Sequence, residues 1–111
     1  HWLEWTIPVA EAGVYAIALR YAARAQATRD CRIDGKTPGP DWDGLAFPDT
    51  GGYSTSADNW SWQLLKERGG SVLQRELTVG DHALRLINRG AGMAVDALFL
   101  IPIDCAKELE Q

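Results

Sequence analysis

The sequence Val14-Tyr15-Ala16-Ile17-Ala18-Leu19-Arg20-Tyr21 places a bulky apolar side chain at every second position. Successive side chains of a strand point to opposite faces, so this period of two predicts a strand with one buried face. Leu3, Trp5 and Ile7 alternate in the same way, and Glu11-Ala12-Gly13 between the two stretches has the composition of a turn. The chain is therefore predicted to open with a β-hairpin.

The same alternation continues to the end of the chain. Further strands are predicted at residues 29–33, 60–65, 72–77, 82–88 and 95–101, with a short one at 45–47 inside a long Gly/Pro-rich loop. Their spacing of about ten residues is typical of a β-sandwich or barrel. The one helix candidate is 104–110, where Asp104 is placed to cap the first turn. The prediction is an all-β antiparallel fold of about eight strands with a short C-terminal helical tail.

Size and charge exclude several classes of protein. A chain of 111 residues is the size of one domain. Eleven Lys and Arg against fifteen Asp and Glu give a net charge of −4, which argues against the basic face that a nucleic acid requires. The longest uncharged apolar run, residues 97–103, is far too short to cross a bilayer. We therefore expect neither nucleic acid nor a membrane among the partners.

Five tryptophans and an acidic loop are the least ordinary features of the chain. Trp5 is expected in the core, and of the pair in the strand at 60–65 we expect Trp62 rather than Trp60 to be buried. Residues 37–59 carry four aspartates, Trp42 and Tyr53, and neither Lys nor Arg. An exposed aromatic ring packs on the apolar face of a pyranose, while carboxylates and amides bind its hydroxyls. The sugar-binding candidates are Trp42, Tyr53, Trp60, Asp41, Asp43, Asp58 and Asn59; the alternative is that the aspartates only cap turns.

Signatures of catalysis are missing from the sequence. It has no Gly-x-Ser-x-Gly, dinucleotide-binding, P-loop or His-Glu-x-x-His motif. His82 lies in a predicted strand and is better explained as a surface histidine than as a base. Asp41-Trp42-Asp43-Gly44 is similar to a calcium loop, but Leu45 and Gly52 stand where an EF-hand needs oxygen ligands. A hydrolase that uses two carboxylates stays open as an alternative, because their separation depends on the fold. No catalytic residue and no metal ligand is predicted.

The two cysteines, Cys31 and Cys105, fit no zinc-binding spacing and no Cys-x-x-Cys motif. They form either one disulfide or two ordinary thiols. Neither is expected to take part in catalysis.

A set of short motifs follows one another in a familiar order from Trp2 to about Leu100. They are Trp2-Leu3-Glu4-Trp5-Thr6, Glu11-Ala12-Gly13-Val14-Tyr15, Leu19-Arg20-Tyr21-Ala22, Cys31-Arg32-Ile33-Asp34-Gly35, Phe47-Pro48-Asp49-Thr50-Gly51-Gly52-Tyr53, Trp60 with Trp62, Leu84-Arg85-Leu86 and Val95-Asp96. This order resembles the carbohydrate-binding modules of families 6 and 35.

The resemblance implies a jelly-roll β-sandwich of the galactose-binding-like type that binds a polysaccharide or oligosaccharide and has no activity of its own. Such modules accompany catalytic domains, so the partner implied is a glycoside hydrolase or polysaccharide lyase domain of the same secreted or cell-surface bacterial protein. Residues 1–103 would form the module and residues 104–111 a tail or linker. Because the chain begins at His1 rather than Met, we expect it to be a piece of a longer protein. The alternative is a structural sandwich that braces a neighbouring catalytic domain and binds no ligand.

Two positions depart from the family's pattern. Ala94 stands where the family often has asparagine before the last strand, and the opening strand with glutamate calcium ligands is not present in this sequence. Asp96 is then the one matching candidate for the structural calcium. No cofactor is predicted for this chain, with structural calcium left open for the full-length domain. We expect Asp96 to be buried and hydrogen-bonded, with Arg20, Arg89 or the turn at 90–92 as partner.

Overall fold

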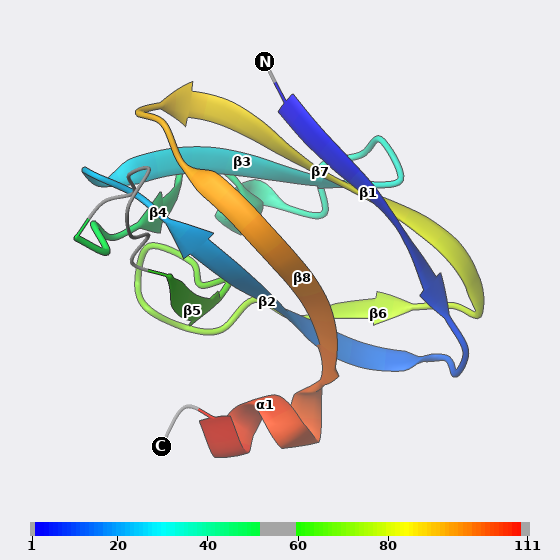
Figure 1. Cartoon of the computed structure of the whole chain (residues 1–111). Helices are drawn as coiled ribbons and strands as arrows, with labels where there is room; N and C mark the ends of the chain where they lie inside the picture. The colour runs from blue at the N-terminus through cyan, green and yellow to red at the C-terminus, as the bar shows by residue number, and fades with distance from the viewer. Residues whose placement is uncertain (1, 52–59, 110–111) are drawn as a thin grey trace.

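The computed structural model describes residues 2–51 and 60–109 of the chain. Its elements in chain order are β1 (Trp2–Val9), β2 (Gly13–Ala22), β3 (Ala27–Ile33), the 3-10 turn η1 (Pro40–Trp42), β4 (Leu45–Phe47), β5 (Ser61–Leu64), β6 (Arg75–Leu77), β7 (Gly80–Gly90), β8 (Ala94–Pro102) and α1 (Ile103–Leu109) (Figure 1). Every predicted strand is present, although β6 begins three residues later than predicted. The C-terminal helix is confirmed as well.

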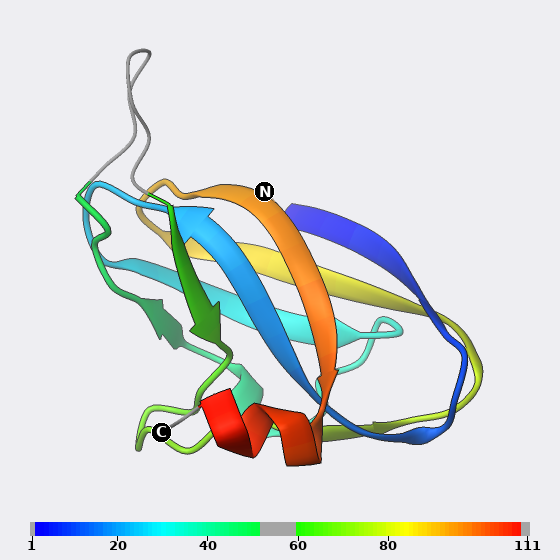
Figure 2. The same cartoon turned by 60° about the horizontal axis from the view of Figure 1, so that its bottom comes forward.

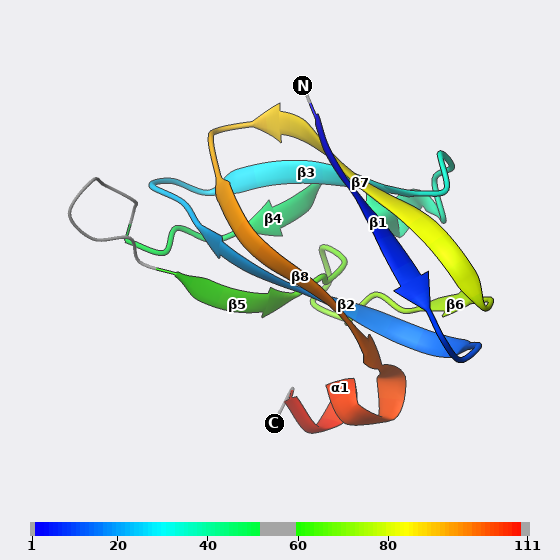
Figure 3. The ribbon, with the colours of Figure 1, turned by 45° about the vertical axis from the view of Figure 1, so that its right-hand side comes forward.

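The strands form two antiparallel sheets, and Figure 3 shows them as two layers. The first, which we call the β7 sheet, has the order β1-β7-β3-β4. The second, which we call the β2 sheet, has β2 at its centre, with β5 and β6 along one edge and β8 along the other. The predicted all-β antiparallel sandwich is therefore confirmed.

The predicted opening hairpin is wrong. β1 pairs with β7, so that Trp5 lies opposite Leu84, whereas β2 pairs with β5, β6 and β8. The short connection at residues 10–12 carries the chain from one sheet to the other. Alternation in the sequence shows which side chains share a face, but both sheets need such strands, and the pairing partner is chosen by packing across the whole domain.

The core lies between the two sheets. Ile17, Leu19 and Tyr21 of β2 point into it and are at most 2% exposed. The rings of Tyr21 and Phe47 meet edge to face, with 5.4 Å between the centroids. Each such side chain contributes about 1.5–3 kcal/mol by leaving water. This burial fixes the orientation of β2, so that Ala16, Ala18 and Arg20 face outward.

A second, smaller cluster lies on the outer face of the β2 sheet. Ala16, Ala18 and Leu64 form a small buried cluster there together with Ala106 of α1. Figure 2 shows α1, in red, following the end of β8, and the helix contacts both β8 and β2. The helix forms because Ile103 and Ala106, three residues apart, share the face that covers the sheet.

The structure settles two questions that the sequence left open. Cys31 and Cys105 are both free, the first fully buried in the core and the second exposed on α1. Burial raises the pKa of the Cys31 thiol to about 12. Trp5 packs against the core as predicted, but Trp62 is 53% exposed, which contradicts the prediction that it is buried. Trp62 pairs with Arg20 and shares its outward direction, so it lies on the outer face of the sheet.

Candidate functional site

Residues 23–26, 48–51, 60 and 91–93 lie at one end of the sandwich, which we call the loop end. The first residues of the long loop are held against the end of β2. Thr50 donates its backbone N–H to the carbonyl of Ala23 at 3.0 Å, and its hydroxyl accepts from the Ala23 N–H at 3.0 Å. The phenol of Tyr21 donates to the carbonyl of Pro48 at 2.9 Å, and burial together with Asp49 raises the Tyr21 pKa. The loop therefore leaves the sheets from a fixed position.

Trp42 does not belong to this end of the molecule. It closes η1 in the connection from β3 to β4, at the opposite end of β4 from the long loop, and it is only 5% exposed within the core. The expectation that Trp42 is an exposed loop aromatic is wrong, because the 3-10 turn folds its ring inward. The buried ring offers no face on which a sugar can stack. Asp41 lies beside it and is exposed.

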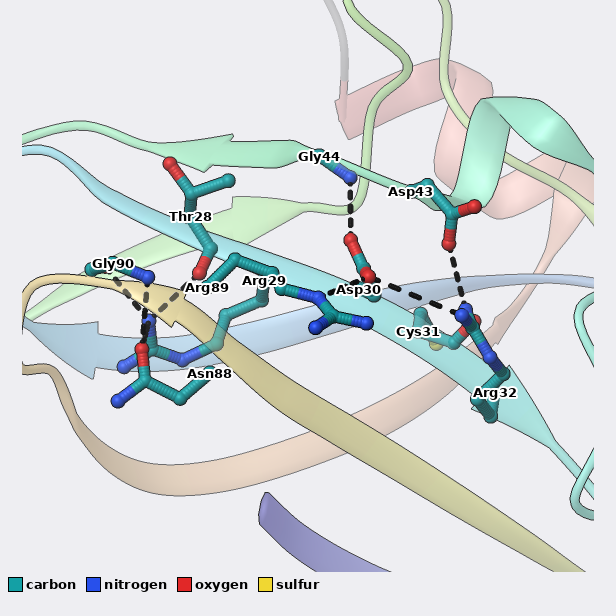
Figure 4. A network of polar contacts seen from close by, with 10 residues as sticks. All are labelled: Thr28, Arg29, Asp30, Cys31, Arg32, Asp43, Gly44, Asn88, Arg89 and Gly90. Atoms are coloured by element: carbon teal, nitrogen blue, oxygen red, sulfur yellow. Dashed lines mark hydrogen bonds and ion pairs between the residues drawn. The ribbon is translucent and has the colours of Figure 1, made fainter. Parts of the chain in front are cut away.

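Asp43 belongs to a network of polar contacts that joins β3, β7 and the connection directly before β4 (Figure 4). Its carboxylate accepts from Arg32 at 2.7 Å. At the centre is Asp30, 7% exposed, which accepts from the Gly44 N–H at 2.8 Å and from Arg89 Nε at 2.5 Å. Gly44 has φ +65°, a backbone conformation that favours glycine. The network holds strands together, and Asp43 is committed to it.

The pKa of Asp30 reflects this setting. Burial disfavours the charged carboxylate, but the hydrogen bonds from Gly44 and Arg89 and the charges of Arg89 and Arg32 outweigh it, so the pKa lies below its ordinary value. The neighbouring Arg29 is also buried, and its guanidinium donates to the carbonyls of Thr28 and Gly90 and to Asn88. Burial lowers the pKa of Arg29.

Trp60 lies at the loop end, directly before β5, and it has polar neighbours. The Arg20 guanidinium stands over its ring, 5.2 Å from the centroid, and pairs with the Asp96 carboxylate at 2.5 Å. A register shift between β2 and β8 makes Asp96 an extra residue in its strand, and such a bulge re-aims a side chain. An indole, five N–H donors and a carboxylate thus meet on the outer face of the β2 sheet.

Asp96 corrects one prediction and confirms another. Arg20 is its partner, as proposed, but the carboxylate is 43% exposed rather than buried. Arg20 was not among the predicted site residues. The sequence did indicate its direction, because Arg20 falls on the face of β2 opposite to Ile17, Leu19 and Tyr21. Tyr53, Asp58 and Asn59 lie outside the described residues.

His82 is held between two acceptors at the other end of the sandwich. Its Nδ1 lies 2.7 Å from Asp34 and its Nε2 2.8 Å from the carbonyl of Thr78. Both contacts require a proton on the nitrogen, so the protonated ring is favoured. The hydrogen bond to Asp34 and that to Thr78 accordingly raise the pKa of His82. With both nitrogens engaged, the ring has no free base for catalysis.

The described residues contain no group of three or more His, Cys, Asp or Glu side chains that could hold a metal ion. None of the helices in the described ranges is long and apolar enough to cross a membrane.

Solved structures of carbohydrate-binding modules have a similar fold. A family 35 carbohydrate-binding module from Paenibacillus barcinonensis superposes with a TM-score of 0.68 at 20% identity, covering 89% of this chain and 68% of the module. A module of the Cellvibrio mixtus lichenase 5A, solved with cellotriose, gives 0.55 at 19% identity over 90% of this chain and 69% of its own. The chain has the fold of a carbohydrate-binding module of the family 35 and family 6 type. The modules it matches are non-catalytic domains.

A larger enzyme carries a similar module. A cycloisomaltooligosaccharide glucanotransferase of a Paenibacillus species, solved with cycloisomaltoheptaose, matches 87% of this chain with a TM-score of 0.63 at 28% identity. The chain spans only 12% of that enzyme. No protein-family model and no curated protein matches the sequence.

Proposed function

We propose that this module is a non-catalytic carbohydrate-binding domain of a larger, secreted polysaccharide-active protein. The observation that carries the proposal is the grouping of Trp60, Arg20 and Asp96 on one outward face beside the loop end. An indole packs against the C–H face of a pyranose, and a guanidinium paired with a carboxylate supplies both donors and acceptors for vicinal hydroxyls. The ring of Trp60 therefore suits the C–H face of a pyranose, and the Arg20–Asp96 pair suits its hydroxyls.

The loop residues extend the same proposal. Asp58 and Asn59 directly precede Trp60 in the sequence, and Tyr53 belongs to the same loop. We assign them to the rim of the site, where they would add hydrogen bonds and a second ring. Asp41, Trp42 and Asp43 are left out of this proposal. They belong to the connection from β3 to β4, whereas the long loop leaves the other end of β4.

Native gel electrophoresis in the presence of soluble polysaccharides tests the proposal. Gels containing dextran, mannan, xylan or a mixed β-glucan should slow the wild-type chain on at least one polymer. Trp60→Ala should abolish that retardation while lowering the melting temperature by only a few degrees, because the ring is only partly buried. Trp2→Ala is the matched control, since Trp2 is 50% exposed on β1, in the other sheet. Equal retardation of wild type and Trp60→Ala would contradict the assignment.

A second candidate function rests on two other side chains. Trp62 and Phe99 are 53% and 52% exposed on the outer face of the β2 sheet, and exposed aromatic patches also mark interfaces between domains. In that case the domain braces a catalytic neighbour. Absence of retardation on all four polymers would favour this candidate over carbohydrate binding.

A further inference from the structure

The outer face of the β2 sheet carries an open groove with a volume of about 810 Å³. Trp62 of β5 and Phe99 of β8 stand on either side of β2 and lean together, with ring centroids 5.3 Å apart and planes inclined by 33°. We call this pair the aromatic ledge. Leu64, Ile101 and Lys66 also line the groove. Its volume lies within the range of small-molecule binding sites.

The ledge exists because the residue between the two rings is small. Ala18 lies opposite Phe99 on one side and Leu64 on the other, and it lines the floor of the groove. Side chains two strands apart in a sheet are separated by about 10 Å, so two rings meet only across a floor without bulk. The inward residues of β2 are Ile and Leu, whereas its outward residues at this level are alanines.

The ledge is continuous with the site proposed above. Arg20 lies directly opposite Trp62 in one pairing and Ala97 in the other, two residues along β2 from Ala18. Two residues of a strand advance by about 7 Å. One outward strip therefore runs along β2 from the Arg20 and Asp96 pair, over the ledge, toward α1.

The lining of the groove indicates the kind of ligand. Among the described residues that line it, most are apolar, and Lys66 is the only one with a charged side chain. The other polar residue, Gln63, already donates its side-chain amide to the carbonyl of Ala46 at 3.0 Å. Such a surface gives stacking area with few hydrogen bonds, and it provides little charge for an anionic polymer.

We infer that the ligand is an internal stretch of a neutral polysaccharide chain, which lies along β2 with one sugar unit at Trp60 and later units on the aromatic ledge. This inference rests on the proposed function and specifies its substrate. The strip is longer than one pyranose ring, and the groove is open, so the chain enters and leaves along the sheet. Trp60, Arg20 and Asp96 recognise one unit, and Trp62 and Phe99 add affinity for the units that follow.

Calorimetric titration with sugars of increasing length tests the inference. The probes are isomalto-, cello- and manno-oligosaccharides from the monosaccharide to the hexasaccharide. For the series that binds, affinity should rise at least tenfold from the disaccharide to the hexasaccharide. Trp62→Ala and Phe99→Ala should each lower hexasaccharide affinity at least fivefold and leave disaccharide affinity within twofold, whereas Trp60→Ala should weaken both.

Matched variants separate the ledge from a general effect on folding. Val79→Ala removes an apolar side chain that is 64% exposed outside the groove, and it should change nothing. Trp62→Phe keeps an aromatic ring and should retain most of the wild-type affinity for the hexasaccharide. Ala18→Leu keeps both rings but fills the floor between them, and it should remove the advantage of the longer sugar. Melting temperatures of all variants are compared with the wild type.

Two results would overturn the inference in different ways. Affinity that does not grow with chain length, or that survives loss of both ledge rings while Trp60→Ala abolishes it, would show a site for a single sugar and leave the proposed function intact. Absence of binding for every series and every length would overturn the proposed function together with the inference.

Discussion

Replacement of Asp30 by alanine tests how β3 is held to β7 and to the connection before β4. The Asp30 side chain is 9% exposed and accepts from the Gly44 N–H and from Arg89, with Arg32 at 3.9 Å. Loss of one partner of a buried ion pair costs about 3–5 kcal/mol. Arg89 is 52% exposed and regains water in the variant, which places the expected loss near the lower limit, about 3 kcal/mol. For a domain of this size that corresponds to a fall in Tm of roughly 12–20 °C.

Urea unfolding followed by tryptophan fluorescence measures this loss. Asp30→Asn keeps an acceptor for Gly44 but removes the charge, so its loss of stability should lie between those of the alanine variant and the wild type. Asp41→Ala removes an exposed carboxylate from the neighbouring connection and should change the free energy of unfolding by less than about 0.5 kcal/mol. A loss in Asp30→Ala no larger than that in Asp41→Ala would refute the reasoning.

The pH dependence of the same variants gives a second reading. The pKa of Asp30 lies below its ordinary value of 3.8 in the folded protein. A carboxyl group with a depressed pKa contributes stability above its unfolded pKa, and that contribution is lost as the pH falls through the folded value. The difference between wild type and Asp30→Ala should therefore be constant from pH 7 to about pH 5 and shrink below pH 4.

Three further predictions follow from the described contacts. The pKa of His82 is raised above 6.5, so its contribution is present below pH 6.5 and is lost as the pH rises through the folded value; His82→Gln should remove this pH dependence from urea unfolding between pH 6 and 9. Asp96→Ala should cost less than about 1 kcal/mol in the same assay, because the ion pair with Arg20 is 36% and 43% exposed, and a loss above 2 kcal/mol would contradict that exposure. A thiol reagent should label Cys105 in the folded protein and reach Cys31 only after denaturation, whereas rapid labelling of both would show that the core opens.

The strands of this domain could be predicted residue by residue because alternation is a local property. Ile17, Leu19 and Tyr21 share a face in any strand, whatever its partners, and all three are buried. Pairing depends instead on residues far apart in the chain, and the short turn before β2 gave a misleading signal for a hairpin. That turn connects the two sheets, because β1 belongs to the β7 sheet and β2 to the β2 sheet.

The candidate site was likewise predictable in its residue types but not in the surroundings of each side chain. The composition of the chain predicted a sugar site made of aromatic rings and carboxylates, and the assignment of Trp60 to that site stays a prediction. The environment of each ring was not readable from the sequence: η1 folds Trp42 into the core, and the pairing of β5 with β2 turns Trp62 outward. Phe99 was missed because a phenylalanine in an apolar strand is usually a core residue.

The sequence by itself determined the strand positions, the fold class and the kind of side chain available for binding, because side-chain polarity and the period of two act between near neighbours. Only the tertiary structure decided which of those side chains meet. Arg20, Asp96 and Trp60 come together across β2, β8 and the start of β5, and Trp62 reaches Phe99 across Ala18. Each of these contacts depends on strand registers that are set by burial of the opposite face, which involves the whole core at once.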